Sequence, residues 1–272
     1  MNVNRKTLFV LLACLLGTAG LVVAQDTHKV MVPAYFFPYD NDDAGSHNVG
    51  PKWSALINAA AKYGDRLVII ANPDNGPGAG PNVKDTWQFQ KYTEAINKVR
   101  AHGAKVIGYV FTCYGLTRDT ALCAGRTTEN VLQDIANWKA WYNVDGIFLD
   151  ENSSQVEQLG WYKDLDKAIQ AKWPDGLIVS NYGTQPAGRY LNRPGAPVMM
   201  ENTAEHLDAN LRDLRNLPPS SVVLIHTTTD GNWKARRNAL KNKGVAYLYV
   251  TDDGADKNPW DTLPTFLINL FN

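Results

Sequence analysis

The chain has 272 residues, and its 27 Lys and Arg side chains balance its 27 Asp and Glu side chains, so the formal net charge is zero. That balance provides no electrostatic basis for binding nucleic acid or an anionic membrane surface. Aromatic residues make up 10% of the chain, including eight Trp and twelve Tyr. This content suits a protein that holds sugar rings, although large cores use aromatic side chains as well.

The N-terminus has the features of a secretory signal peptide. Arg5 and Lys6 precede an apolar stretch over residues 7–23, and small residues lead up to Ala24. We predict a signal peptide over residues 1–24 with cleavage after Ala24 and release of the protein to the extracellular or periplasmic space. A membrane anchor is the alternative, because the apolar stretch approaches the length of a span. After cleavage we expect no membrane span.

The predicted mature chain, residues 25–272, keeps 248 residues and has a formal charge of −2. This is the usual size of one (β/α)8 barrel, about 250 residues. Eight short apolar runs rich in β-branched and aromatic residues occur along it. These candidate strands are 29–37, 66–72, 105–112, 144–151, 177–181, 197–202, 222–227 and 245–252.

Helix-length amphipathic segments alternate with these runs. The candidate helices are 53–64, 87–103, 129–143, 161–173, 232–244 and 260–271. Because the strands are nearly continuous apolar runs, both faces of the sheet should be buried, as in a parallel sheet covered by helices. With no linker and no composition break, the pattern predicts an α/β protein with a single (β/α)8 TIM barrel. An open doubly wound sheet is the alternative.

Acidic residues end two of the candidate strands. Asp150 and Glu151 close VDGIFLDE, and Glu201 closes APVMMEN. Helix capping is the simple explanation for the first pair, but adjacent strand residues point in opposite directions, so the two cannot share one capping role. In a parallel barrel the chemistry gathers at the C-terminal strand ends. These three acids are therefore the candidate catalytic set of a paired-carboxylate hydrolase.

Other polar and aromatic residues also lie at strand ends, where they are candidates for binding a substrate. For His226 a core position is equally compatible with the sequence, and for Asp252 a turn. No group of His and Cys residues has the spacing of metal ligands, so we expect no metal and no cofactor. The substrate-binding candidates are Tyr109, Tyr35, Asn72, Tyr114, Asn181, His226 and Asp252.

Cys113 and Cys123 are the two cysteines that remain after signal cleavage. In an exported protein, a pair this close predicts a disulfide that closes one loop. Free thiols are the alternative if the compartment is reducing.

With these motifs in order, the chain resembles the spherulation-specific family 4 (spherulin-4-like) proteins of glycoside hydrolase family 135. The resemblance rests on VPAYFFP, IIANPDNGPG, VIGYVFTCYG, the block from Trp138 to Glu151, MMEN and the closing YLYVTDD. It implies a secreted barrel enzyme that cleaves α-1,4-linked N-acetylgalactosamine in galactosamine-containing exopolysaccharide, with Asp150, Glu151 and Glu201 as its acidic set. One departure is SNYGT at 180–184, where the resemblance implies Asn-Pro-Gly and this chain has Tyr182.

The sequence thus predicts a secreted, endo-acting and retaining glycosidase, working as a monomer on a polysaccharide. Asp150 would be the nucleophile, ionised in a polar setting, and Glu201 the drier general acid/base with the raised pKa. One rival is a non-catalytic polysaccharide-binding or spore or cell-coat protein on the same fold. The other is a hydrolase that acts on a different α-glycan.

Overall fold

The structure is a computed structural model of the chain, and it describes residues 28–39, 49–78, 82–184, 186–193, 198–203, 218–254 and 258–272. The side chains of residues 198–202 are not among the described parts. The predicted signal peptide, residues 1–24, lies outside the described residues.

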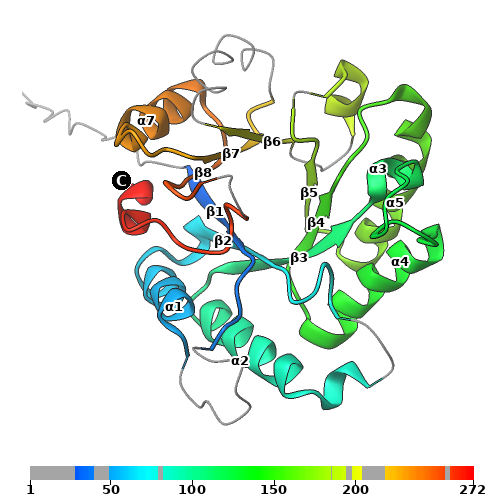
Figure 1. The fold of residues 1–272 in the computed structure, drawn as a ribbon, viewed down its shortest axis with the longest axis horizontal. Helices are drawn as coiled ribbons and strands as arrows, with labels where there is room; N and C mark the ends of the chain where they lie inside the picture. The colour runs from blue at the N-terminus through cyan, green and yellow to red at the C-terminus, as the bar shows by residue number, and fades with distance from the viewer. Residues whose placement is uncertain are drawn as a thin grey trace, which may run out of the picture.

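Eight parallel strands pair in chain order, and β8 pairs with β1, so that the sheet closes into a barrel (Figure 1). The seams between β5 and β6 and between β8 and β1 are thin, with two residue pairs each. The strands are β1 (Lys29–Ala34), β2 (Leu67–Ala71), β3 (Lys105–Phe111), β4 (Gly146–Asp150), β5 (Leu177–Asn181), β6 (Val198–Thr203), β7 (Val222–His226) and β8 (Tyr247–Val250).

The strands are buried on both faces, as their apolar runs predict. All five residues of β2 and all five of β7 are buried. Closure through Val30 and Leu248 excludes the open doubly wound sheet. The parallel sheet predicted from the sequence is therefore confirmed.

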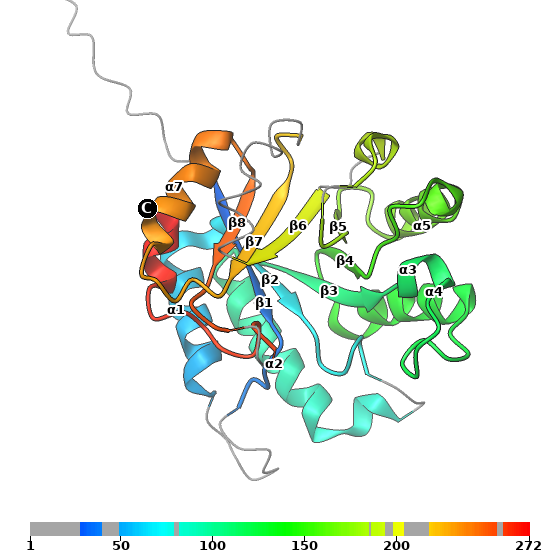
Figure 2. The ribbon, with the colours of Figure 1, turned by 45° about the horizontal axis from the view of Figure 1, so that its top comes forward.

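Helices cover the outside of the sheet, as Figures 1 and 2 show. After β5 the described residues form only a 3-10 helix, Gly188–Asn192, and residues 204–217, after β6, are not described. The fold is thus TIM-like, but the described residues do not show eight complete β/α units. The α-helices are α1 (Pro51–Tyr63), α2 (Trp87–Ala101), the short α3 (Cys113–Leu116), α4 (Thr128–Asn137), α5 (Leu159–Lys172) and α7 (Trp233–Lys243), and a π-helical turn, Trp138–Tyr142, extends α4.

The C-terminal segment corrects one prediction. The sequence suggests a helix over 260–271, whereas the structure has only a 3-10 helix at Leu267–Phe271. Pro264 stands in the middle of the predicted helix, where it lacks the N–H that a helix interior requires. The segment still contributes to the core, because Leu270 and Phe271 are buried.

Candidate active site

The two faces of β3 decide which side chains point into the barrel. A Cβ on Gly108 would lie 2.2 Å from the Trp138 ring, so residue 108 faces the covering helix. Tyr109, the next residue, therefore faces the interior. Phe148 on β4 is in register with Tyr109, and their ring centroids lie 5.8 Å apart. Asp150 is two residues beyond Phe148, so it faces the interior at the C-terminal end of β4.

Two donors from neighbouring strands hold the Asp150 carboxylate. The Tyr109 hydroxyl donates to Oδ2 at 2.6 Å, and Asn181 Nδ2 donates to Oδ1 at 2.7 Å. The Asn181 amide is oriented in turn, because its Oδ1 accepts the Gly183 N–H at 2.8 Å. Both carboxylate oxygens thus act as acceptors, which is the arrangement that suits an ionised group.

Burial nevertheless raises the pKa of Asp150 above its ordinary value. The Tyr109 hydroxyl, the Glu151 backbone N–H and the Asn181 amide oppose that rise in pKa by stabilising the charge. The Asp150 carboxylate thus has polar partners, and the residue stays partly exposed at the end of β4.

Glu151 turns to the other side of the strand end, toward the loop after β3. Its Oε1 accepts from Arg118 Nη1 at 2.8 Å, and its carbonyl accepts the Tyr114 N–H at 2.7 Å. Its φ of +51° lies in the left-handed region, which is unfavourable for a residue with a side chain. Burial raises the pKa of Glu151, the Arg118 charge lowers it, and the Asp150 charge raises it.

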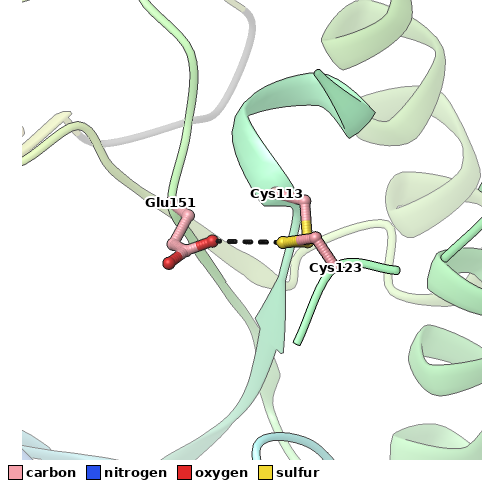
Figure 3. Close-up of side chains that lie close together, drawn as sticks. All are labelled: Cys113, Cys123 and Glu151. Atoms are coloured by element: carbon pink, nitrogen blue, oxygen red, sulfur yellow. Dashed lines mark hydrogen bonds between the residues drawn. A yellow bond between two sulfur atoms is a disulfide. The ribbon is translucent and has the colours of Figure 1, made fainter. Parts of the chain in front are cut away.

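The predicted disulfide between Cys113 and Cys123 is present in the structure, and it lies against Glu151 (Figure 3). Cys123 Sγ is 3.9 Å from Glu151 Oε2, and since the sulfur is oxidised this is a contact without a donated proton. These three residues are also close enough for their ligand atoms to surround an ion. Sulfurs joined in a disulfide offer no thiolate, so this group does not fit a metal.

Three residues that the sequence did not single out support the acidic pair. The Thr112 hydroxyl lies 2.8 and 2.9 Å from the carbonyl oxygens of Asp150 and Glu151, and 2.9 Å from the Tyr162 hydroxyl. Thr112 and Tyr162 are fully buried. The third is Arg118, and its place inside the loop between two cysteines is the one sequence signal that could have found it.

The chain matches the model of the spherulation-specific family 4 over residues 29–272. It belongs to this family. The resemblance seen in the sequence is thereby confirmed. Spherulin-4 of Physarum polycephalum is 28% identical over 252 residues, covering 88% of this chain and 68% of that protein.

Solved barrel structures resemble the fold of this family 4 protein. Sph3 of Aspergillus clavatus, solved in complex with GalNAc, superposes with a TM-score of 0.68 at 21% identity, covering 90% of this chain and 97% of that one. A GH5-4 endoglucanase from Clostridium acetobutylicum superposes with a TM-score of 0.56 at 12% identity, covering 91% of this chain and 94% of that one. At these identities the likeness shows the fold alone, a TIM-like barrel.

Two further predicted binding residues lie close to the acids. Tyr35 meets Tyr109 edge to face, with ring centroids 5.5 Å apart. Tyr114 is exposed, and the Arg118 guanidinium lies 5.1 Å from its ring centroid. Tyr35 is thus linked to Asp150 through Tyr109, and Tyr114 is linked to Glu151 through its backbone N–H.

The remaining predicted residues have other surroundings. Asn72 Oδ1 accepts the Gly76 N–H at 3.1 Å, which shapes the loop after β2. His226 is buried, with its Nδ1 2.8 Å from Thr227 Oγ1 and its ring against Trp260. Asp252 is exposed beside a pocket of about 410 Å³ formed with residues that follow β7. None of the described contacts joins these three to Asp150 or Glu151.

Glu201 is described through its backbone alone. It belongs to β6 and pairs with Leu224 of β7. Its side chain lies outside the described part of the structure.

The departure from the expected Asn-Pro-Gly is explained by a buried ion pair. Tyr182 is buried, and its hydroxyl accepts from Arg193 Nη1 at 2.6 Å. The same guanidinium donates to both carboxylate oxygens of Asp166, at 2.8 and 2.5 Å. Tyr182 is thus anchored directly after Asn181, which binds Asp150.

Proposed function

We propose that this protein is a secreted glycoside hydrolase that cleaves α-1,4-linked N-acetylgalactosamine or galactosamine within an exopolysaccharide, acting as an endo-acting, retaining enzyme. The observation that carries the proposal is the Asp150 carboxylate, held by Tyr109 and Asn181 inside the C-terminal mouth of the barrel. Family membership and the glycosidase-type barrel support it. The sugar is suggested by Sph3, which was solved with GalNAc.

Asp150 would be the nucleophile. Tyr109 and Asn181 each donate to one of its oxygens, the Glu151 backbone N–H is a third donor, and the carboxylate keeps a lone pair for attack on the anomeric carbon. These donors orient the carboxylate, and they hold it in the ionised form against the effect of burial. Attack would break the glycosidic bond while the general acid protonates the leaving oxygen, and it would give a covalent glycosyl-enzyme. Water, deprotonated by the same residue acting as a base, would then hydrolyse this intermediate and release Asp150.

Glu201 would be the general acid/base. Met199 of β6 pairs with Asn181, and Glu201 follows two residues later, so residue 201 shares the face of residue 181 by register. Strands β4 and β6 are next-but-one neighbours, roughly 9–10 Å apart. Side chains leaning inward from that spacing can reach the separation of about 5–5.5 Å that retaining enzymes use, whereas inverting enzymes use about 6.5–9.5 Å.

Binding of sugar rings is proposed for Tyr35, Tyr109 and Tyr114, since aromatic faces suit the apolar faces of sugars. Export is supported by the Cys113–Cys123 disulfide, a bond typical of oxidising compartments. Among the helices that the structure describes, none has the length and apolar character to cross a membrane.

The test is incubation of the purified mature protein with a panel of exopolysaccharides, with products read by mass spectrometry. We expect oligosaccharides from a galactosamine-containing polymer and from no other member of the panel, and none with Asp150→Asn. Products from another α-glycan alone would replace the proposed substrate. Binding without any product would favour the non-catalytic coat protein.

The stereochemistry is tested separately, by NMR of the first-formed product from the α-linked polymer. We expect the α-anomer, and an initial β-anomer would overturn the retaining assignment.

A further inference from the structure

Arg118 is the one basic residue whose described contacts reach the acidic pair, and it stands inside the disulfide loop. Its Nη1 lies 2.8 Å from Glu151 Oε1, with side-chain exposures of 42% for Arg118 and 23% for Glu151. Cys113 and Cys123 close the loop that carries it. Arg118 is thus carried by a short loop that the disulfide closes, and it forms an ion pair with Glu151, the residue next to Asp150.

The backbone on both sides of this ion pair is in an unfavourable conformation. Cys113, Tyr114 and Leu116 have φ values of +49°, +54° and +64°, and Glu151 has +51°. Such residues persist only where the surrounding structure over-determines them, and they gather at functional sites.

Several bonds hold this turn in place. The Tyr114 N–H reaches the Glu151 carbonyl at 2.7 Å, and the Arg118 N–H reaches the Cys113 carbonyl at 3.1 Å. The disulfide closes the turn covalently. The backbone position of Arg118 is therefore fixed by the loop.

Two adjacent carboxylates create the need for such a cation. The charge of Arg118 lowers the pKa of Glu151, whereas the charge of Asp150 raises it. Without Arg118, a partly buried Glu151 beside Asp150 would be driven toward protonation. A protonated or reoriented Glu151 would disturb the carboxylate next to it.

We propose that Arg118 is a positioning residue for the reaction, and that the disulfide-closed loop holds it where it fixes the Glu151 carboxylate on the side of the strand end opposite to Asp150. The proposal rests on the proposed hydrolase function. Arg118 does its work through Glu151. It differs from a substrate-binding cation, whose loss would raise KM and leave kcat and its pH profile unchanged.

The experiment compares Arg118→Gln and Arg118→Lys with wild type in the full mature chain. Lys98→Gln, which removes an exposed ion pair with Glu94 on α2, is the matched control. We expect Arg118→Gln to lower kcat about tenfold with little change in KM. The acid limb of its pH profile should move to higher pH, because Glu151 loses the charge that lowers its pKa. Arg118→Lys should restore most of the profile, and Lys98→Gln should match wild type.

A second readout does not depend on hydrolysis. The Glu151 carboxyl is titrated by ¹³C NMR in wild type, in Arg118→Gln, and in Cys113→Ser with Cys123→Ser. We expect the titration to move to higher pH in Arg118→Gln and in the double variant. An unchanged titration in Arg118→Gln, or a KM effect alone, overturns the proposal. A shifted titration in a protein that cleaves no polymer would refute the proposed function while retaining the Arg118–Glu151 link.

Discussion

Asn181 donates from Nδ2 to Asp150 Oδ1 at 2.7 Å, and its amide cannot turn over without losing the bond from the Gly183 N–H. The amide therefore offers Asp150 a donor and not an acceptor. This relationship links β5 to β4 across the strand ends, and it favours the charged form of a carboxyl whose burial disfavours charge.

Asn181→Asp should convert this donor into a second carboxylate. One oxygen would still accept the Gly183 N–H, and the other would face Asp150, so that the two acids would share one proton. We expect kcat at neutral pH to fall at least about 100-fold, with partial recovery at lower pH. The pH–rate profile checks this. Asn181→Leu, which carries no charge, should lose activity without any recovery in acid.

Tyr109→Phe removes one hydroxyl and keeps the ring. Because that hydroxyl lowers the pKa of Asp150, its loss should raise this pKa further and move the acid limb of kcat to higher pH. We expect kcat to fall about tenfold, with KM nearly unchanged. Tyr142→Phe is the control, since its buried hydroxyl donates to the Pro77 carbonyl at 3.0 Å instead. A large rise in KM in Tyr109→Phe would show instead that the hydroxyl binds substrate.

Asp150→Asn should abolish hydrolysis, by more than about 1,000-fold in kcat, without unfolding the protein. The folded pKa of Asp150 is raised, so the stability it contributes is present below the unfolded pKa of about 3.9 and is lost as pH rises through the folded pKa. The ionised side chain thus destabilises the fold at neutral pH. We expect the Tm of Asp150→Asn, relative to wild type, to be higher at pH 7 than at pH 3.5. Thermal unfolding at pH 7 and at pH 3.5 measures this. The same Tm difference between variant and wild type at both pH values would contradict the prediction.

The buried pair of Arg193 and Asp166 should matter more for stability than any exposed ion pair. Their side chains are 0% and 2% exposed, and Arg193→Met would leave a buried carboxylate without its cation. We expect a loss of about 3–5 kcal/mol in the free energy of unfolding. Urea denaturation measures it. Arg193→Met with Asp166→Leu should recover part of the loss, while Lys167→Gln, from an exposed pair, should cost less than about 1 kcal/mol.

Replacing both Cys113 and Cys123 with Ser should lower the free energy of unfolding by about 2–3 kcal/mol, the value expected for closing a loop of this length. Thermal unfolding of the double variant beside unreduced and reduced wild type checks it. The reduced wild type should match the double variant. A reduced protein as stable as the oxidised one would mean that other contacts fix the loop.

Local sequence pattern determined much of this protein. Apolar runs of strand length located all eight strands within a few residues, because a strand that is buried on both faces consists of consecutive apolar residues. The spacing of Cys113 and Cys123 predicted the disulfide, and the acids at the end of VDGIFLDE predicted a carboxylate at the barrel mouth.

Tertiary structure decided what those residues touch. Asp150 meets Tyr109 and Asn181, which lie 41 and 31 residues away, and only the register of three strands brings them together. Glu151 adopts a left-handed backbone because the turn at Cys113 binds its carbonyl, and no local propensity favours that conformation. Strand periodicity is a property of neighbouring residues. Hydrogen-bond partners, and the pKa shifts that they cause, depend on the pairing of strands that are far apart in the sequence. Only the tertiary structure therefore determines them.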